Sequence, residues 1–114
     1  MEIEIVTNQI TRGRLKELAL RRFGDLVKAV VDIERRVMAV GGELHADEEQ
    51  VLLDQGSKQQ NLWGINLYPD IEDVSWIEFD SMINLRPSQG NRSRGVDDEA
   101  MRRRITEVVQ GLIK

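Results

Sequence analysis

Residues 86–95 gather side chains that can hold an anion. Arg86, Arg92 and Arg94 supply planar guanidinium groups, and Gln89 and Asn91 supply amides. A helix start is expected directly after this segment, and arginine donors beside a helix N-terminus suit phosphate or carboxylate. The segment therefore predicts an anion-binding loop, with a phosphate-bearing ligand or RNA as the partner.

The same arginines have a purely structural interpretation. Residues 43–80 hold ten acidic residues and one basic residue, whereas residues 86–104 hold six arginines. Arg86 and Arg92 could reach back to this acidic region, for example to Asp80 or Glu78, and pin the loop in place. Both interpretations stay open at this point.

A second candidate site is the segment Gly41–Asp47. In an extended chain Glu43, His45 and Asp47 point the same way, and Asp32 could approach from a neighbouring hairpin. Such a group could transfer protons. Its spacing matches no established metal motif, so no metal site is predicted. In the alternative, Asp47 caps a helix and His45 bonds a backbone group.

Several familiar chemistries have no sequence support. The chain contains no cysteine, which excludes disulfides, thiolate metal sites and a cysteine nucleophile. It shows no phosphate-loop lysine motif, no dinucleotide-binding glycine pattern and no nucleophile-elbow serine. We therefore expect no cofactor.

The composition is that of an ordinary globular chain. With 114 residues, 40% of them hydrophobic and 32% charged, it predicts one domain over 1–114. The net charge of −4 argues against non-specific binding of nucleic acid over the whole surface. The sequence predicts no signal peptide and no membrane span, so the expected location is cytoplasmic.

Local patterns predict the elements that would position these residues. Thr11 is the expected N-cap of a first helix that Gly24 ends, and Leu15, Leu18, Ala19 and Phe23 share its apolar face. Asp47 and Asp97 are the expected N-caps of a second and a third helix. Alternating or β-branched residues predict strands at 3–5, 26–33, 37–40, 63–67 and 77–85.

These elements follow the order β-α-β-β-α-β-β-α. The expected fold class is α+β, a mostly antiparallel sheet with helices packed on one face. Trp63 and Trp76 lie in or beside strand-like segments, so they are expected in the core or in an interface, and not as a platform for stacking bases.

Three unusual segments together resemble a known family. They are residues 41–47 (GGELHAD), 55–69 (QGSKQQNLWGINLYP) and 83–93 (INLRPSQGNRS). The chain resembles, over nearly its whole length, a small prokaryotic family classed only as a domain of unknown function. The resemblance implies a single-domain protein and brings no activity, cofactor or catalytic residue.

Three function classes follow from the residues. The first is a binding or interaction protein whose loop, with Arg86, Gln89, Asn91, Arg92 and Arg94, engages an anion. The second is a small hydrolase or ribonuclease-like enzyme that uses Glu43, His45 or Asp47 together with that loop. The third is a structural homodimer without a ligand.

Overall fold

A five-stranded antiparallel sheet organises the computed structural model, which describes residues 3–114. The strands are β1 (Glu4–Val6), β2 (Val27–Asp32), β3 (Val37–Val40), β4 (Leu62–Leu67) and β5 (Ile77–Glu78). Their spatial order is β1-β3-β2-β4-β5, and all neighbouring pairs are antiparallel. The two central strands, β2 and β4, pair over six residues each.

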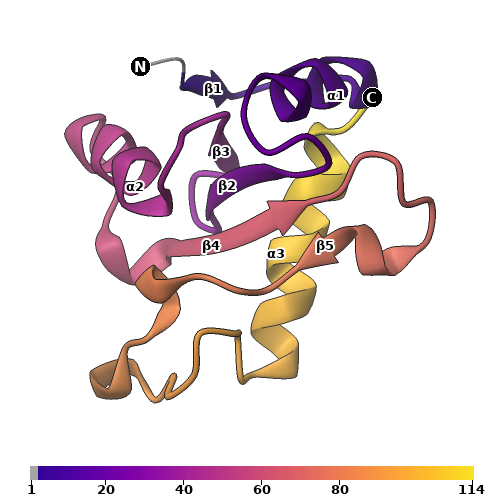
Figure 1. The fold of residues 1–114 in the computed structure, drawn as a ribbon. Coiled ribbons are helices and arrows are strands. Elements are labelled where there is room, and N and C mark those ends of the chain that lie inside the picture. The colour runs from indigo at the N-terminus through magenta and orange to yellow at the C-terminus, as the bar shows by residue number, and fades with distance from the viewer. Residues whose placement is uncertain (1–2) are drawn as a thin grey trace.

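Three α-helices complete the fold, which Figure 1 shows as a ribbon: α1 (Arg12–Arg21), α2 (His45–Asp54) and α3 (Glu99–Leu112). Short 3₁₀ helices lie at Gln59–Asn61, Val74–Trp76, Met82–Asn84 and Pro87–Gln89. The expected α+β class and the order β-α-β-β-α-β-β-α are confirmed. No helix within residues 3–114 is long and apolar enough to cross a membrane.

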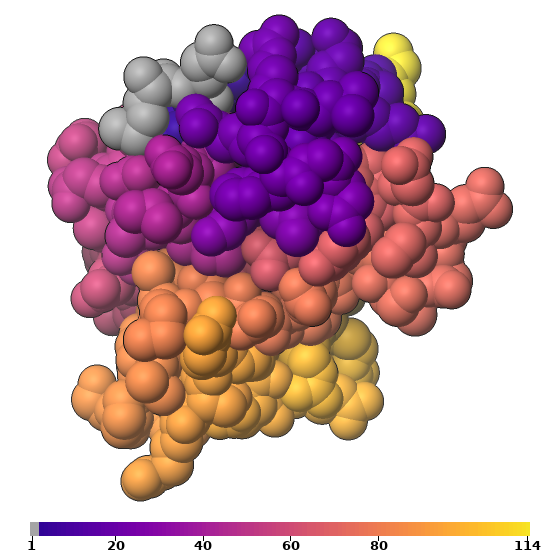
Figure 2. All heavy atoms as spheres, in the orientation of Figure 1, coloured from indigo at the N-terminus to yellow at the C-terminus, as the bar shows by residue number. Residues whose placement is uncertain are grey.

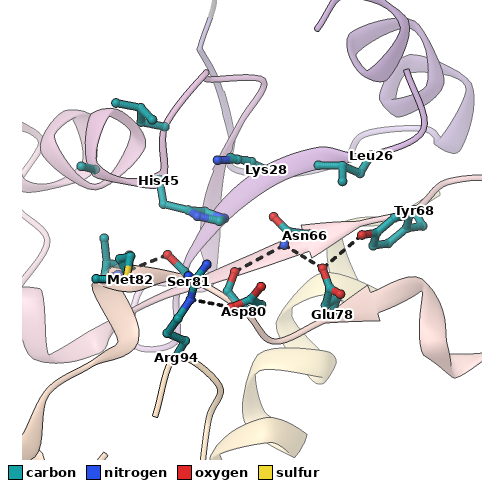
Figure 3. Close-up of a pocket in the computed structure, with 13 residues that line it drawn as sticks. Leu26, Lys28, His45, Asn66, Tyr68, Glu78, Asp80, Ser81, Met82 and Arg94 are labelled. Carbon is teal, nitrogen blue, oxygen red and sulfur yellow. Dashed lines mark hydrogen bonds and ion pairs between the residues drawn. The ribbon is translucent and has the colours of Figure 1, made fainter. Parts of the chain in front are cut away.

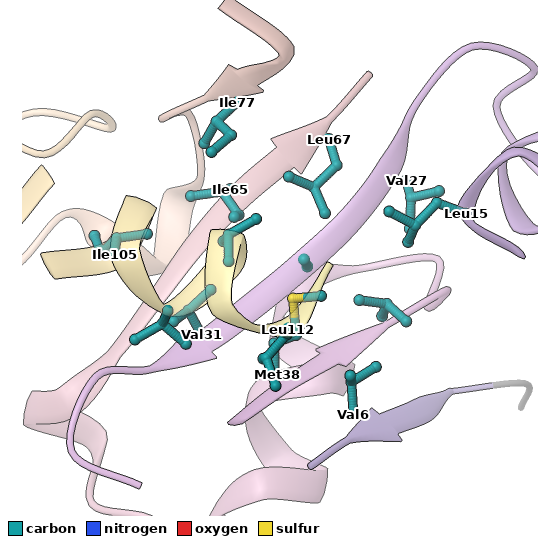
Figure 4. Packing of buried hydrophobic residues seen from close by; sticks show 14 of the residues in the cluster. Val6, Leu15, Val27, Val31, Met38, Ile65, Leu67, Ile77, Ile105 and Leu112 are labelled. Carbon is teal, nitrogen blue, oxygen red and sulfur yellow. The ribbon is translucent and has the colours of Figure 1, made fainter. Parts of the chain in front are cut away.

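The main hydrophobic core lies between one face of the sheet and helices α1 and α3. Figure 4 shows Val31, Met38 and Ile65 from the strands packed with Ile105 and Leu112 of α3. Alternate residues of β2, β3 and β4 contribute to this core, as period-two patterning requires. Phe23, expected on the apolar face of the first helix, lies after the end of α1 and is 41% exposed.

The packing differs from the expected one-face arrangement, because α2 covers the opposite face of the sheet. Leu52 of α2 is fully buried in a second cluster with Val30, Val37 and Ala39. The physical reason is that β2 and β3 are apolar on both faces, and each face must be covered. The sheet is therefore sandwiched between α1 with α3 on one side and α2 on the other.

Helix starts confirm one expected cap and correct two others. The Thr11 side chain accepts a hydrogen bond from the Arg14 amide, as expected of an N-cap. Asp98, and not Asp97, caps α3 by accepting from the Ala100 amide. Leu44 occupies the N-cap position of α2 and makes no side-chain bond, so the Asp47 cap was wrong.

The predicted strand at 77–85 is much shorter than expected. Strand β5 ends at Glu78, and a 3₁₀ helix occupies Met82–Asn84. The fully buried Asn84 explains the end of pairing: its Oδ1 accepts from the Gly64 amide at 2.8 Å and its Nδ2 donates to the Gly64 carbonyl at 2.9 Å. One side chain thus takes both backbone groups that a continuing strand would have used.

Candidate functional site

A cavity of about 520 Å³ opens on the α2 side of the sheet. Helix α2 covers β2 and β3 on this face but leaves the exposed edge toward β5 open, as the close-up in Figure 3 shows. Lys28 of β2, Asn66 of β4 and Glu78 of β5 line the cavity. The register pairs Lys28 with Asn66 and Asn66 with Glu78, so the three residues form one row across three strands.

His45, the first residue of α2, was predicted as a site residue from the sequence, and it lines this cavity. The residue is largely buried. Its Nε2 lies 2.8 Å from the Ile65 carbonyl oxygen. A carbonyl only accepts, so Nε2 carries the proton and Nδ1 is left with a lone pair in the neutral ring. Burial lowers the pKa of His45, and the bond to Ile65 acts in the opposite direction. The imidazole is therefore neutral at physiological pH.

The start of α2 also faces the cavity. Leu44, His45 and Ala46 all line it, and no side chain caps the first turn. Within residues 3–114, the amide N–H groups of His45 and Ala46 have no hydrogen-bond partner. Unpaired amides at a helix start carry partial positive charge, although the carboxylate of Asp47, which does not line the cavity, offsets part of it.

Lys28 contributes the unpaired cation of the site. Its ammonium nitrogen lies 5.2 Å from the centre of the Phe23 ring, and no residue in the described range 3–114 forms an ion pair or hydrogen bond with it. Lys28 acts on His45 electrostatically and helps to lower the pKa of that residue. A half-buried lysine without a counter-ion beside a cavity is a ready partner for an anionic group.

The opposite wall is built around Glu78. Asn66 Nδ2 donates to Glu78 Oε1 at 2.8 Å, and the Tyr68 hydroxyl donates to the same oxygen at 3.1 Å. Asn66 Nδ2 also reaches the Asp80 carbonyl at 3.3 Å. Both groups that contact this atom accept hydrogen bonds, so the atom is the amide nitrogen and the oxygen Oδ1 points the other way. Asn66 Oδ1 is buried, has no partner within the described chain and lies on the side facing Lys28 (Figure 3).

Arg94 is the member of the predicted anion-binding loop that lines the cavity. Its Nε donates to Asp80 Oδ1 at 2.9 Å, so the ion pair expected between Asp80 and Arg86 or Arg92 forms with Arg94. Asp80 and Arg94 both act electrostatically on His45, with opposite effects on the pKa of His45. The structure thus brings together an arginine of the loop and the histidine of the second candidate segment.

A close approach of two chain segments holds this wall in place. Ser81 is 1% exposed and lies against Gly64, where an added Cβ would come within 2.5 Å of the Ser81 Cβ. Only glycine permits this approach. The Ser81 amide donates to the Arg94 carbonyl at 2.9 Å, which ties the segment after β5 to the end of the loop.

The other loop residues have structural partners. Figure 2 shows the loop, in orange, at the lower end of the molecule. Arg86 donates to the carbonyls of Gln59, Leu62 and Ile83, and its guanidinium lies 4.3 Å from the centre of the Trp63 ring. Gln89 Nε2 donates to the Gln60 carbonyl at 3.2 Å. These contacts attach the start of the loop to the start of β4 and to the 3₁₀ helix that precedes it.

Asn91 closes the loop on itself. It is 4% exposed, and its Nδ2 donates to the carbonyls of Asn84, Ser93 and Gly95. Asp97, which was expected to cap the last helix, instead accepts from the Arg92 amide at 2.8 Å. The Arg92 side chain is exposed and does not line the cavity. Of the residues predicted to bind an anion, only Arg94 lines it.

Glu43 and Asp47 do not join His45 at the cavity. Glu43 is exposed and lies 4.0 Å from Arg22, while Asp47 lies in the first turn of α2. Helical geometry separates Asp47 from His45, because residues two apart on a helix point to different sides, and Glu43 precedes the helix. Asp32 is buried elsewhere and accepts from Ser57. Among residues 3–114 no three His, Asp or Glu side chains could hold a metal ion.

Sequence reasoning missed four residues of the site: Lys28, Asn66, Tyr68 and Glu78. Each of them lies in or beside a strand with an apolar pattern, where a polar residue is normally interpreted as facing solvent. Asn66 carried the one usable signal, because an amide in the middle of the strand Leu62–Leu67 is unusual when the residues around it are buried. Their grouping depends on strand register, which a single sequence does not reveal.

A second cavity of about 400 Å³ lies near the other end of β5. Its cation, Arg12, is already engaged by the carbonyls of Pro69 and Ile71 and by the Trp76 ring at 4.0 Å. No unpaired buried polar atom within the described residues faces this cavity. The first cavity is therefore the better candidate for a ligand.

The fold and the cavity define an α+β protein with a mixed-charge pocket on one face of its sheet. The chain belongs to the family described as "Protein of unknown function (DUF5674)", whose model matches residues 4–112. This confirms the family resemblance carried by the three segments. No curated protein and no solved structure matches the chain.

Proposed function

We propose that this protein binds a small molecule by its anionic group, in the cavity between the start of α2 and strands β2, β4 and β5. The observation that carries the proposal is the half-buried side chain of Lys28, which has no ion pair or hydrogen bond within residues 3–114. It stands next to a helix start whose first amides have no partner in the described chain. Two independent sources of positive potential therefore act on one cavity.

The surrounding residues support a pre-formed binding site. Tyr68, Asn66 and Glu78 are held together by hydrogen bonds, and Arg94 is held by Asp80. Rigid walls reduce the entropy cost of binding. A cavity of about 520 Å³ has the size of pockets that take small molecules. The anion site is thus proposed beside Lys28 and the start of α2, in the cavity that Arg94 of the 86–95 loop also lines.

This arrangement favours binding over the other functions considered. The hydrolase predicted from the sequence pairs His45 with Glu43 or Asp47, and neither of these two carboxylates lines the cavity. Single-stranded RNA would need exposed rings for stacking, whereas Trp63 and Trp76 are 4% and 5% exposed. A homodimer and a cytoplasmic location stay predictions, which light scattering and cell fractionation would test.

NMR titration of the ¹⁵N-labelled protein with acetate and with inorganic phosphate tests the proposal. We expect shifts at Lys28, His45, Ala46 and Arg94, with dissociation constants of about 1–10 mM for such small probes. Lys28→Gln should abolish the shifts, whereas Lys58→Gln, a change of an exposed lysine outside the cavity, should leave them intact. Shifts scattered over the surface, or shifts that persist in Lys28→Gln, would refute the site.

A further inference from the structure

The row of residues across the cavity floor has opposite charges at its two ends. Lys28, Asn66 and Glu78 lie on adjacent strands in direct register. Strands are spaced about 4.8 Å apart, so the Cα atoms of Lys28 and Glu78 are separated by roughly 10 Å. Neither charge is neutralised by an ion pair within residues 3–114. The cavity therefore has a cationic side and an anionic side.

The anionic side presents carboxylate oxygens that no group within residues 3–114 uses. Asn66 directs its Nδ2 toward this side and turns its buried, unpartnered Oδ1 toward Lys28 (Figure 3). The hydrogen bonds to Glu78 all use Oε1, and that to Asp80 uses Oδ1, which leaves one oxygen of each carboxylate for a ligand. Arg94 balances the charge of Asp80, so Glu78 gives this side its net negative charge, and the free oxygens of Glu78 and Asp80 are acceptors. A cationic donor would satisfy them.

An apolar rim completes the cavity. Leu44 at the start of α2 and Met82 after β5 both line it and are 53% and 63% exposed. Leu26 and Ile83 add further apolar surface to the lining. Exposed apolar side chains around a polar floor favour a ligand with an apolar part that covers them.

We propose that the ligand is a small zwitterion with an apolar side chain, of the chemical class of an apolar α-amino acid. The inference rests on the proposed anion site and specifies the rest of the ligand. The carboxylate binds on the side of Lys28 and the α2 amides, and the ammonium binds on the side of Glu78 and Asp80. The apolar side chain lies against Leu44 and Met82.

A matched set of three compounds tests each part of the ligand. Leucine carries both charges, 4-methylpentanoate lacks the ammonium, and 3-methylbutylamine lacks the carboxylate. NMR titration of the full chain should show leucine binding at least about tenfold more tightly than either analogue, since each loses a charge-assisted contact. Valine, methionine and phenylalanine are titrated alongside to cover other sizes of apolar side chain.

The outcomes separate this inference from the proposed function. If 4-methylpentanoate binds as tightly as every amino acid of the set, the anion site stands and the zwitterion is refuted. If no compound of the set shifts any cavity residue and acetate and phosphate also fail, both proposals are refuted. If only the amine binds, the cavity takes a cation, and both the anion site and the zwitterion are refuted.

Variants of the anionic side give the second test. Glu78→Gln keeps the Oε1 acceptor for Asn66 and Tyr68 but removes the charge. We expect leucine to lose about tenfold in affinity while 4-methylpentanoate changes less than about twofold. Asp80→Asn provides an independent variant if Glu78→Gln does not fold. Glu107→Gln on the exposed surface of α3 is the matched control. Unchanged discrimination in both cavity variants would overturn the inference.

Discussion

Asn84 is the residue whose removal should damage the fold most for its size. It is fully buried, and its amide pairs with the N–H and the carbonyl of Gly64 and with the Arg94 carbonyl at 3.0 Å. In Asn84→Ala these three backbone groups lose their partner. The same change loosens the attachment of the Arg94 segment to β4, and so also affects the cavity.

The expected loss follows from the number of orphaned groups. An unsatisfied buried polar group costs about 1–3 kcal/mol, and water can reach some of them after truncation. Three groups give about 3–6 kcal/mol, a large part of the 5–15 kcal/mol that typically stabilises a domain. At neutral pH Asn84→Asp should cost at least as much as Asn84→Ala, because it buries a carboxylate against the Gly64 and Arg94 carbonyls.

Urea denaturation followed by circular dichroism measures this loss, and amide hydrogen exchange locates it. The Gly64 amide should exchange faster in Asn84→Ala than the change in global stability alone requires. Asn8→Ala is the matched control, because Asn8 is exposed and makes no side-chain hydrogen bond within residues 3–114. A loss below about 1 kcal/mol in Asn84→Ala would refute the role of this side chain as a substitute strand partner.

Three further predictions concern charged groups. Burial raises the pKa of Glu48 well above its usual value, so the folded state holds this proton more tightly than the unfolded chain. Stability therefore falls as pH rises from the usual glutamate range through the raised pKa. Glu48→Gln should remove this fall in denaturation curves measured from pH 4 to 9. Burial lowers the pKa of His45, so the folded state takes up this proton less readily than the unfolded chain, and stability falls as pH drops from the usual histidine range through the lowered pKa. ¹⁵N NMR of this single histidine should show Nε2–H at pH 7, and a protonated ring there would contradict the assignment. Arg86→Ala should lower stability by about 2–4 kcal/mol, because several carbonyls lose a hydrogen-bond donor and the Trp63 ring loses its contact with the guanidinium. Arg92→Ala should change stability by less than about 0.5 kcal/mol, because the Arg92 side chain is exposed. Equal losses of both variants in thermal melts would contradict these structural roles.

The sequence by itself determined the elements whose signals are local. Thr11 caps α1 and Gly24 follows its end with a φ of 90°, as their residue types indicate. The alternation of Trp63, Ile65 and Leu67 marks β4, and all three side chains are buried. Such signals depend on residues within a few positions of one another, so a single sequence displays them.

The position of α2 required the tertiary structure, although the sequence held a sign of it. Val37–Val40 is apolar at all four positions, which is typical of a strand covered on both faces. No sequence pattern indicated that β5 would end at Glu78. Residues 77–85 alternate as a strand would, and only the approach of Asn84 to Gly64 shows why pairing stops.

The candidate site was decided almost wholly by tertiary structure. His45 and Arg94 stood out from the sequence by their residue types, but their shared cavity depends on how α2 and the 86–95 loop pack. The row of Lys28, Asn66 and Glu78 depends on strand register, and a shift of one residue would turn each side chain to the other face. The register of β2, β4 and β5 joins residues far apart in the chain, so patterns within a single strand do not show which residues face each other.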